Sequence, residues 1–250
     1  SWETHPDLLT LIDASKTTDT SFSDLKGTGM SWSDGGTVSH VAAAGGVGPY
    51  WDMSGGRFYT TTRREVGSSY TLFYYWSPSS ANDKSLHRGA TYDDTWVLVP
   101  NNNLGFYANS RSPTGFKDTT YDITVDTWQT LIVTGVATDV AAGVGTSTYY
   151  VNGVQVGTVG RVASGDTTWV IGLNYPGYVA VAGVLNTALD TTEITALHNH
   201  MTSSKTSTGF CSACPVGKTS DAGVGKTCDK CAAGYSGSWE SHPDLLTLID

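Results

Sequence analysis

Four cysteines carry the spacing best suited to chemistry, Cys211-x2-Cys214-x13-Cys228-x2-Cys231. Two C-x-x-C pairs at such a spacing either bind zinc through four thiolates or form disulfides in a small module with little core. The sequence has no further cysteine, and its composition is typical of extracellular proteins, which favours disulfides. Three connectivities are open. We favour Cys211–Cys228 with Cys214–Cys231, because a bond inside C-x-x-C is strained and closes little chain.

Two other motifs point away from enzymatic chemistry. The Gly-Lys-Thr triplets at 217–219 and 225–227 lack the glycine that a phosphate-binding loop needs five residues earlier, where Ser212 and Ser220 stand instead. Glycoside hydrolysis on a β-sandwich needs two carboxylates on one strand face. The four glutamates are scattered, and none is followed two residues later by aspartate. We therefore expect a protein that is not an enzyme.

Eight tryptophans and thirteen tyrosines could provide stacking platforms for sugar rings. Trp32, Trp51 and Trp96 lie beside turns rich in glycine and aspartate. We therefore expect them to be exposed, and they are the candidate glycan-binding residues. Three other indoles fall in apolar runs and are expected in the core: Trp76, Trp128 and Trp169.

The first thirteen residues recur almost unchanged at 238–250, with twelve of thirteen positions identical and Thr4 replaced by Ser241. An offset of 237 residues is far longer than a solenoid repeat. We therefore interpret the sequence as one independently folding repeat followed by the start of the next. The apolar residues expected to set the geometry of the inter-repeat junction are Trp2, Trp239, Leu245, Leu246, Leu248 and Ile249.

The overall composition limits the partners. Charged residues make up 15% of the chain, below the usual ~25%. The net charge of −9 argues against nucleic acid and against anionic membrane surfaces. The sequence contains no apolar run long enough to insert into a membrane. These features predict an extracellular or cell-surface location.

Residues 7–201 alternate short apolar runs with turn residues, which predicts a β-sandwich. The strongest signal is the hairpin at 147–159, where Asn152-Gly153 favours a type I′ turn pairing Val151 with Val154 and Tyr149 with Val156. Residues 70–76 are bulky on both faces and predict a central strand. Further strands are expected at 7–12, 95–99, 104–108, 128–136, 169–173 and 177–186.

One helix is expected at 191–201, where Asp190 and Glu193 form a capping box. Residues 202–210 then read as a polar linker. Its hydroxyl groups are candidates for O-glycosylation, namely Thr202, Ser203, Ser204, Thr206, Ser207 and Thr208.

Residues 7–201 resemble the laminin-G-type branch of the concanavalin A-like lectin and glucanase superfamily. The likeness rests on the opening LLTLIDAS, the YYVNGVQVG hairpin and the closing GYVAVAGVLNTALDTTEITALHNHM. It implies a jelly-roll sandwich of antiparallel sheets. It also implies a structural Ca²⁺ ion as a candidate cofactor, with loop aspartates as its ligands. The candidates are Asp93, Asp94, Asp118 and Asp122.

Residues 211–237 resemble the cysteine-rich modules of the ephrin-receptor type, through the C-x-x-C-P-x-G and C-x-x-C-x-x-G-Y phrases. The expected organisation is a junction at 1–6, a sandwich at 7–201, a linker at 202–210, a cysteine-rich module at 211–237 and the next repeat from 238. Such an architecture resembles surface-filament proteins such as mastigonemes. We expect a structural repeat of an extracellular fibre that contacts its own neighbours, or alternatively a lectin-like adhesion module that binds carbohydrate.

Overall fold

The computed structural model describes residues 2–16, 18–19, 21–23, 25, 31–43, 48–81, 83–206, 218–219 and 230–231. The last two pairs form a short antiparallel ladder of β15 (Lys218–Thr219) and β16 (Lys230–Cys231). The side chains of this ladder, the cysteines at 211, 214 and 228, and the second copy at 238–250 lie outside what is described. The disulfide pairing and the role of the second junction therefore stay predictions.

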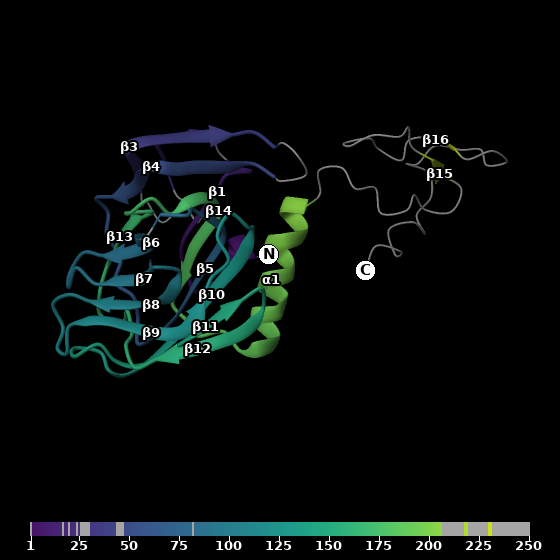
Figure 1. Cartoon of the computed structure of the whole chain (residues 1–250). Helices are drawn as coiled ribbons and strands as arrows, with labels where there is room; N and C mark the ends of the chain where they lie inside the picture. Colours follow the sequence, from purple (N-terminus) through teal and green to yellow (C-terminus); the bar gives the residue numbers. More distant parts are fainter. Residues whose placement is uncertain are drawn as a thin grey trace.

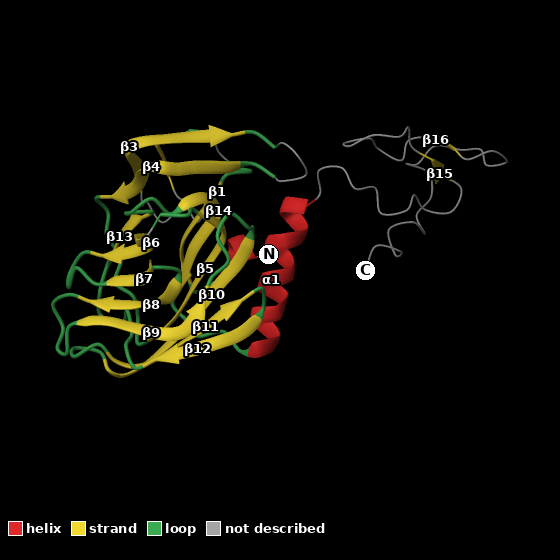
Figure 2. Cartoon of the chain, viewed as in Figure 1, coloured by secondary structure: helices red, strands yellow, loops and turns green. Residues whose placement is uncertain are grey.

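The chain from residue 8 to residue 185 forms an all-β jelly-roll sandwich of antiparallel strands (Figures 1 and 2). The first layer contains β1 (Leu8–Asp13), β14 (Gly177–Leu185), β5 (Ser69–Pro78), β10 (Gln129–Asp139), β11 (Val144–Val151) and β12 (Val154–Val159). The second layer contains β13 (Thr168–Ile171), β6 (Asp83–Gly89), β7 (Thr95–Pro100), β8 (Asn103–Ala108) and β9 (Gly115–Asp122). A long hairpin connects the layers, made of β3 (Ser31–Val41) and β4 (Tyr50–Thr60), with β2 (Ser21–Ser23) beside β3.

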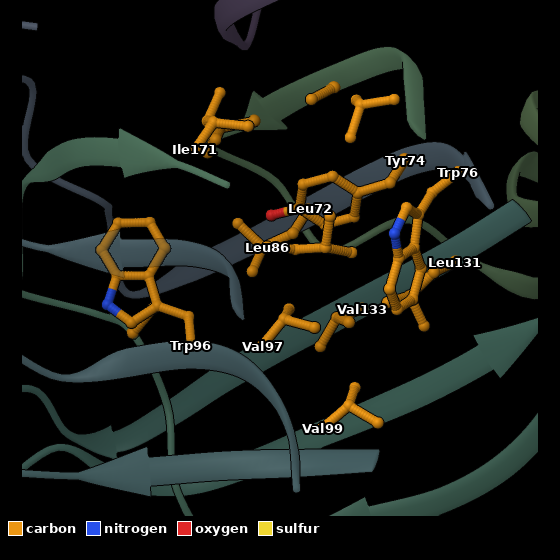
Figure 3. Close-up of a cluster of buried hydrophobic side chains, with 14 of the residues drawn as sticks. Leu72, Tyr74, Trp76, Leu86, Trp96, Val97, Val99, Leu131, Val133 and Ile171 are labelled. Carbon is orange, nitrogen blue, oxygen red and sulfur yellow. The ribbon is translucent and has the colours of Figure 1, made fainter. Parts of the chain in front are cut away.

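β5 is buried on both faces, as its sequence predicts. Its even-numbered side chains, including Leu72, Tyr74 and Trp76, belong to the core between the two layers. Figure 3 shows them facing the side chains of the second layer. Phe73 and Tyr75 point to the opposite face, where they join a second core. An uninterrupted apolar run is stable in this strand because both of its faces are removed from water.

The second core is covered by helix α1 (Thr191–Thr206), which lies against the outer face of the first layer (Figure 1). Ile194, Leu197 and Met201 are buried there. The capping box is confirmed, because the Asp190 amide donates to Glu193 Oε2 and the Glu193 amide donates to Asp190 Oδ1, both at 2.9 Å. No helix in the described ranges is long and apolar enough to cross a membrane.

The helix continues five residues beyond its predicted end, so the prediction of a linker starting at residue 202 is wrong. The Thr202 hydroxyl donates to the His198 carbonyl at 3.0 Å, and the Ser203 hydroxyl donates to the His200 carbonyl at 3.2 Å. Hydroxyls that bond to the preceding turn let threonine and serine remain helical. Of the O-glycosylation candidates, Thr202 to Thr206 are therefore helical, whereas Ser207 and Thr208 lie outside the described ranges.

The hairpin prediction is confirmed at its turn and corrected beyond it. Asn152 and Gly153 both have positive φ, at 50° and 77°, as a type I′ turn requires, and Val151 pairs with Val154. The register then shifts, so that Tyr149 pairs with Gly157 and not with Val156. A β-bulge in β12 inserts the extra residue.

Candidate binding groove

The three tryptophans proposed for sugar stacking are all buried, which corrects the expectation that they are exposed. Trp32, Trp51 and Trp96 each have 0% exposure. The Trp32 indole donates to Thr10 Oγ1 at 3.2 Å, and the Trp96 indole donates to Asp166 Oδ2 at 3.2 Å. Each indole is on the inward face of its strand, so the neighbouring turn residues do not bring it to the surface. Trp76 is in the core as predicted, whereas Trp169 is only half-buried.

The outer face of the second layer carries a row of side chains that crosses four strands. Arg88 on β6 pairs with Thr95 on β7, Thr95 pairs with Tyr107 on β8, and Tyr107 pairs with Phe116 on β9. Paired residues in neighbouring strands lie on the same face of a sheet. The pairing therefore places an aromatic pair at one end of the row and a guanidinium at the other.

This row borders a groove of about 340 Å³, a size suited to a small ligand. Tyr107 is 38% exposed. The remaining lining combines apolar, amide and charged side chains, which are Asp83, Ser85, Asp93, Leu98, Pro100, Asn109, Leu173 and Asn174. An aromatic surface beside amides and charges can pack against one face of a polar ring while hydrogen bonding its edge.

Gly105 and Ser85 shape the floor of the groove. A Cβ atom on Gly105 would lie 2.8 Å from Phe116 Cε2 and 2.2 Å from the Lys117 carbonyl oxygen, so only glycine lets the Phe116 ring lie here. Ser85 is buried, and within the described ranges its hydroxyl has no hydrogen-bond partner. An unpaired buried hydroxyl costs free energy unless a ligand or water satisfies it.

The loop between β13 and β14 forms one wall of the groove and is fixed by hydrogen bonds. The Trp76 indole donates to the Pro176 carbonyl at 2.6 Å, and the Ser79 hydroxyl donates to the Tyr175 carbonyl at 2.5 Å. Tyr175 has a φ of 43°, a conformation that costs free energy in a non-glycine residue. Its side chain is 61% exposed. The loop thus fixes the backbone of Tyr175, whose phenol ring is exposed.

A second depression of about 400 Å³ lies on the other side of this loop, with Leu173 and Asn174 lining both. Its floor is formed by glycines of the β3–β4 hairpin, and its other side chains are Arg57 and Tyr175. Arg57 is exposed, and among the described residues no carboxylate lies within ion-pair distance of it. The two depressions therefore differ in charge: the first contains Asp83, and the second contains Arg57.

The aspartates proposed as calcium ligands are not brought together. Asp93 forms an ion pair with Arg88 and accepts a hydrogen bond from Asn109 Nδ2 at 2.8 Å. Asp94 is fully buried and accepts from Arg111 Nε and Nη2, both at 2.8 Å. Asp118 and Asp122 are exposed on β9. In the described part of the chain, no three histidine, cysteine, aspartate or glutamate side chains could hold a metal ion together.

The Asp94–Arg111 pair supports the groove from beneath. Asp94 Oδ1 accepts a hydrogen bond from the backbone amide of Asn109 at 2.6 Å. This bond fixes Asn109, whose side chain lines the groove. Arg111 also donates to the Ser164 carbonyl at 2.8 Å and the Val162 carbonyl at 2.9 Å. Removing one partner of a buried ion pair destabilises the fold, because it leaves an uncompensated charge in the interior.

Two further ionisable groups are buried next to Trp96. His87 stacks on the indole with ring centroids 4.6 Å apart, and Tyr74 Oη lies 2.8 Å from His87 Nδ1. Burial lowers the pKa of His87 to about 3, so the imidazole is neutral in the folded protein. Burial also raises the pKa of Asp166, although hydrogen bonds from the Thr167 amide and the Trp96 indole oppose this effect.

Solved structures match this fold, whereas no family model and no curated protein sequence matches the chain. One match is the binding domain of botulinum neurotoxin DC in complex with rat synaptotagmin II, with a TM-score of 0.59 and 13% identity, covering 78% of this chain and 52% of that one. A second comes from work on botulinum neurotoxin type C, whose cell entry depends on interaction with two ganglioside molecules, with a TM-score of 0.56, 13% identity, and 78% and 51% coverage.

A third match is domain 4 of AbnA, a GH43 extracellular arabinanase from Geobacillus stearothermophilus, in complex with arabinotriose. Its TM-score is 0.54 with 16% identity, covering 77% of this chain and 98% of that one. The chain thus spans about half of the matched neurotoxin domains and nearly the whole arabinanase domain. These similarities establish the sandwich fold.

Sequence reasoning missed the groove residues Tyr107, Phe116, Arg57 and Tyr175. One signal was present: in the predicted strand at 104–108, Leu104 and Phe106 alternate with Gly105 and Tyr107. That alternation places Tyr107 on the face opposite the buried residues. Its pairing with Phe116 depends on which strands are neighbours, which a single strand does not reveal.

Proposed function

We propose that this domain binds carbohydrate in the groove on the outer face of its second layer. The observation that carries the proposal is the exposed Tyr107, which pairs with Phe116 and lines the same groove as Asn109 and Asn174. Sugar rings offer apolar C–H faces to aromatic rings and hydroxyl groups to amides and carboxylates. Two of the matched proteins interact with carbohydrates of this kind, gangliosides in one case and arabinotriose in the other, which supports the same class of ligand.

The contacts define how a sugar would bind. One ring face would pack on Tyr107 and Phe116, and its hydroxyls would bond to the Asn109 amide and the Asp93 carboxylate. Because Arg88 and Asn109 orient Asp93, this carboxylate is positioned before the ligand arrives, and preorganisation lowers the entropic cost of binding. The proposed role is binding without catalysis.

A glycan array followed by calorimetry of the best ligand, with arabino-oligosaccharides and sialylated glycans included, would test the proposal. Tyr107→Ala should weaken binding about tenfold, because it removes one stacking surface. Tyr178→Ala is the matched control, since Tyr178 is 37% exposed against 38% for Tyr107 but lies on the first layer. An array without saturable binding, or an equal loss in the two variants, would contradict a role for this groove.

We also propose, as a second function, that the domain is a repeat unit of an extracellular fibre. The supporting observation is the recurrence of residues 1–13 at 238–250, with twelve identical positions. Two expectations from the sequence are part of this second proposal: the sandwich is of the laminin-G type, and residues 211–237 form a disulfide-linked module. Negative-stain microscopy of a protein that contains several copies should reveal regular filaments, and dispersed monomers would contradict it.

A further inference from the structure

The segment 1–13, which we call the head, occupies a defined slot on the sandwich. Its strand β1 pairs with residues 181–185 of β14, at the edge of the first layer. Its short 3-10 helix η1 (Trp2–Thr4) lies beside α1, where the N-terminus is seen in Figure 1. Trp2 lines a small cavity together with Leu197 and Met201 of that helix. The head is therefore an integral part of the domain, and Trp2 packs on its own sandwich.

Four side chains of the head are buried. Ile12 is completely buried in the core between the layers, and Leu8 and Leu11 belong to the core beneath α1. Thr10 is completely buried and accepts the hydrogen bond from the Trp32 indole. The slot therefore favours apolar side chains at the positions of Leu8, Leu11 and Ile12, and a hydroxyl group at the position of Thr10.

The second copy at 238–250 has the same residue at every one of these positions. Leu245, Thr247, Leu248 and Ile249 correspond to the four buried side chains, and Trp239 corresponds to Trp2. The single difference places serine where Thr4 stands, and Thr4 is exposed. A segment with the sequence 238–250 therefore meets every requirement of the slot.

The slot is also within reach of this second copy. Helix α1 ends at Thr206, and its last turns contact the same cavity as Trp2. The 31 residues 207–237 separate the helix from the second copy. A chain of 31 residues can span at most ~100 Å, so the length of this connection allows the second copy to reach the slot.

We propose that residues 238–250 exchange with residues 1–13 in the head slot of the same sandwich. The two segments compete for one position, and the second copy occupies it when the first is displaced. In a tandem array, the head of each domain then occupies the slot of the preceding domain. Neighbouring domains are thereby joined by a shared strand. The inference does not depend on carbohydrate binding.

Matched substitutions in the 250-residue chain test the exchange, because they disable either copy or both. Ile12→Asp places a carboxylate in the core when the first copy occupies the slot, and Ile249→Asp does the same for the second. Urea unfolding followed by tryptophan fluorescence gives the folding equilibrium constant of each variant. We expect the folding equilibrium constant to fall less than about tenfold in each single variant, and roughly a hundredfold or more in the double variant.

The opposite result is equally clear. If the second copy cannot enter the slot, Ile12→Asp alone equals the double variant and Ile249→Asp is silent, which overturns the proposal. The milder pair Leu11→Ala and Leu248→Ala gives the same comparison in a more stable background. If the exchange takes place within one chain, the stability of the Ile12→Asp variant does not depend on protein concentration. Rescue that rises with concentration and produces dimers would overturn that assignment.

Discussion

Replacing His87 should make the free energy of unfolding less dependent on pH below neutrality. Folded His87 stays neutral down to a pKa of about 3, whereas a histidine in the unfolded chain titrates near ~6.5. Below that unfolded pKa, the unfolded state gains a proton that the folded state does not bind. Stability therefore falls as pH decreases from the unfolded pKa towards the folded one, by about 1.4 kcal/mol per pH unit at most.

The loss between pH 7 and pH 5 follows from these two pKa values. It amounts to about 2 kcal/mol for this one group, because protonation of the unfolded histidine is only partial near pH 7. His87→Gln removes the group while leaving an amide that can bond to Tyr74. Other titrating residues, including Asp166 with its raised pKa, are present in both proteins and cancel in the comparison.

The assay is urea unfolding of the wild type and His87→Gln at pH 7 and pH 5. The variant should be less stable at pH 7, because it loses the stacking on Trp96, but it should lose about 2 kcal/mol less on acidification. His198→Gln is a matched comparison: burial also lowers the pKa of His198, but this histidine is only partly buried. Equal acid sensitivity of the wild type and His87→Gln would refute the assignment of a neutral buried imidazole.

Three further substitutions test the supports of the groove and the helix. Arg111→Met should cost about 3–5 kcal/mol in the free energy of unfolding, because Asp94 is left buried without its partner; an unchanged urea midpoint would contradict this. Asp190→Ala should cost about 1 kcal/mol and reduce helical circular dichroism on heating, since it removes the helix cap. Gly105→Ala should destabilise the sandwich by about 1–3 kcal/mol and displace the Phe116 ring, which calorimetry with a bound glycan would register as weaker binding.

Local patterns in the sequence predicted those elements whose stability depends on local chemistry. The turn at Asn152-Gly153 and the cap at Asp190 are set by residues within a few positions of each other, and both are confirmed. The strand at 70–76 was recognisable because both of its faces are apolar. The register shift opposite Tyr149 was not predictable, because a bulge depends on how the neighbouring strand packs.

Strands whose residues are buried for non-local reasons escaped prediction. β6 contains two polar side chains that are almost completely buried, Lys84 and His87. Their partners make this burial possible, since Lys84 donates to the Ala81 carbonyl and His87 bonds to Tyr74. The glycines at 35–36 and 55–56 indicate turns, yet they lie within β3 and β4. Gly36 has positive φ, and a Cβ there would lie 2.6 Å from the Gly55 carbonyl oxygen. The burial of the candidate tryptophans has the same origin, because the side of a strand that faces the core is decided by its partners.

The two ends of the strand order lie next to each other in the folded domain. β9 and β12 are in contact, and Gly157 lets the backbone of β12 approach Thr119 closely. Unpaired strand edges are the usual starting points for aggregation, and the hazard grows when identical domains are held at high local concentration. By placing its two terminal strands against each other, the sandwich shields both from neighbouring chains. A protein with many copies of this domain would thereby gain resistance to misfolding between adjacent units.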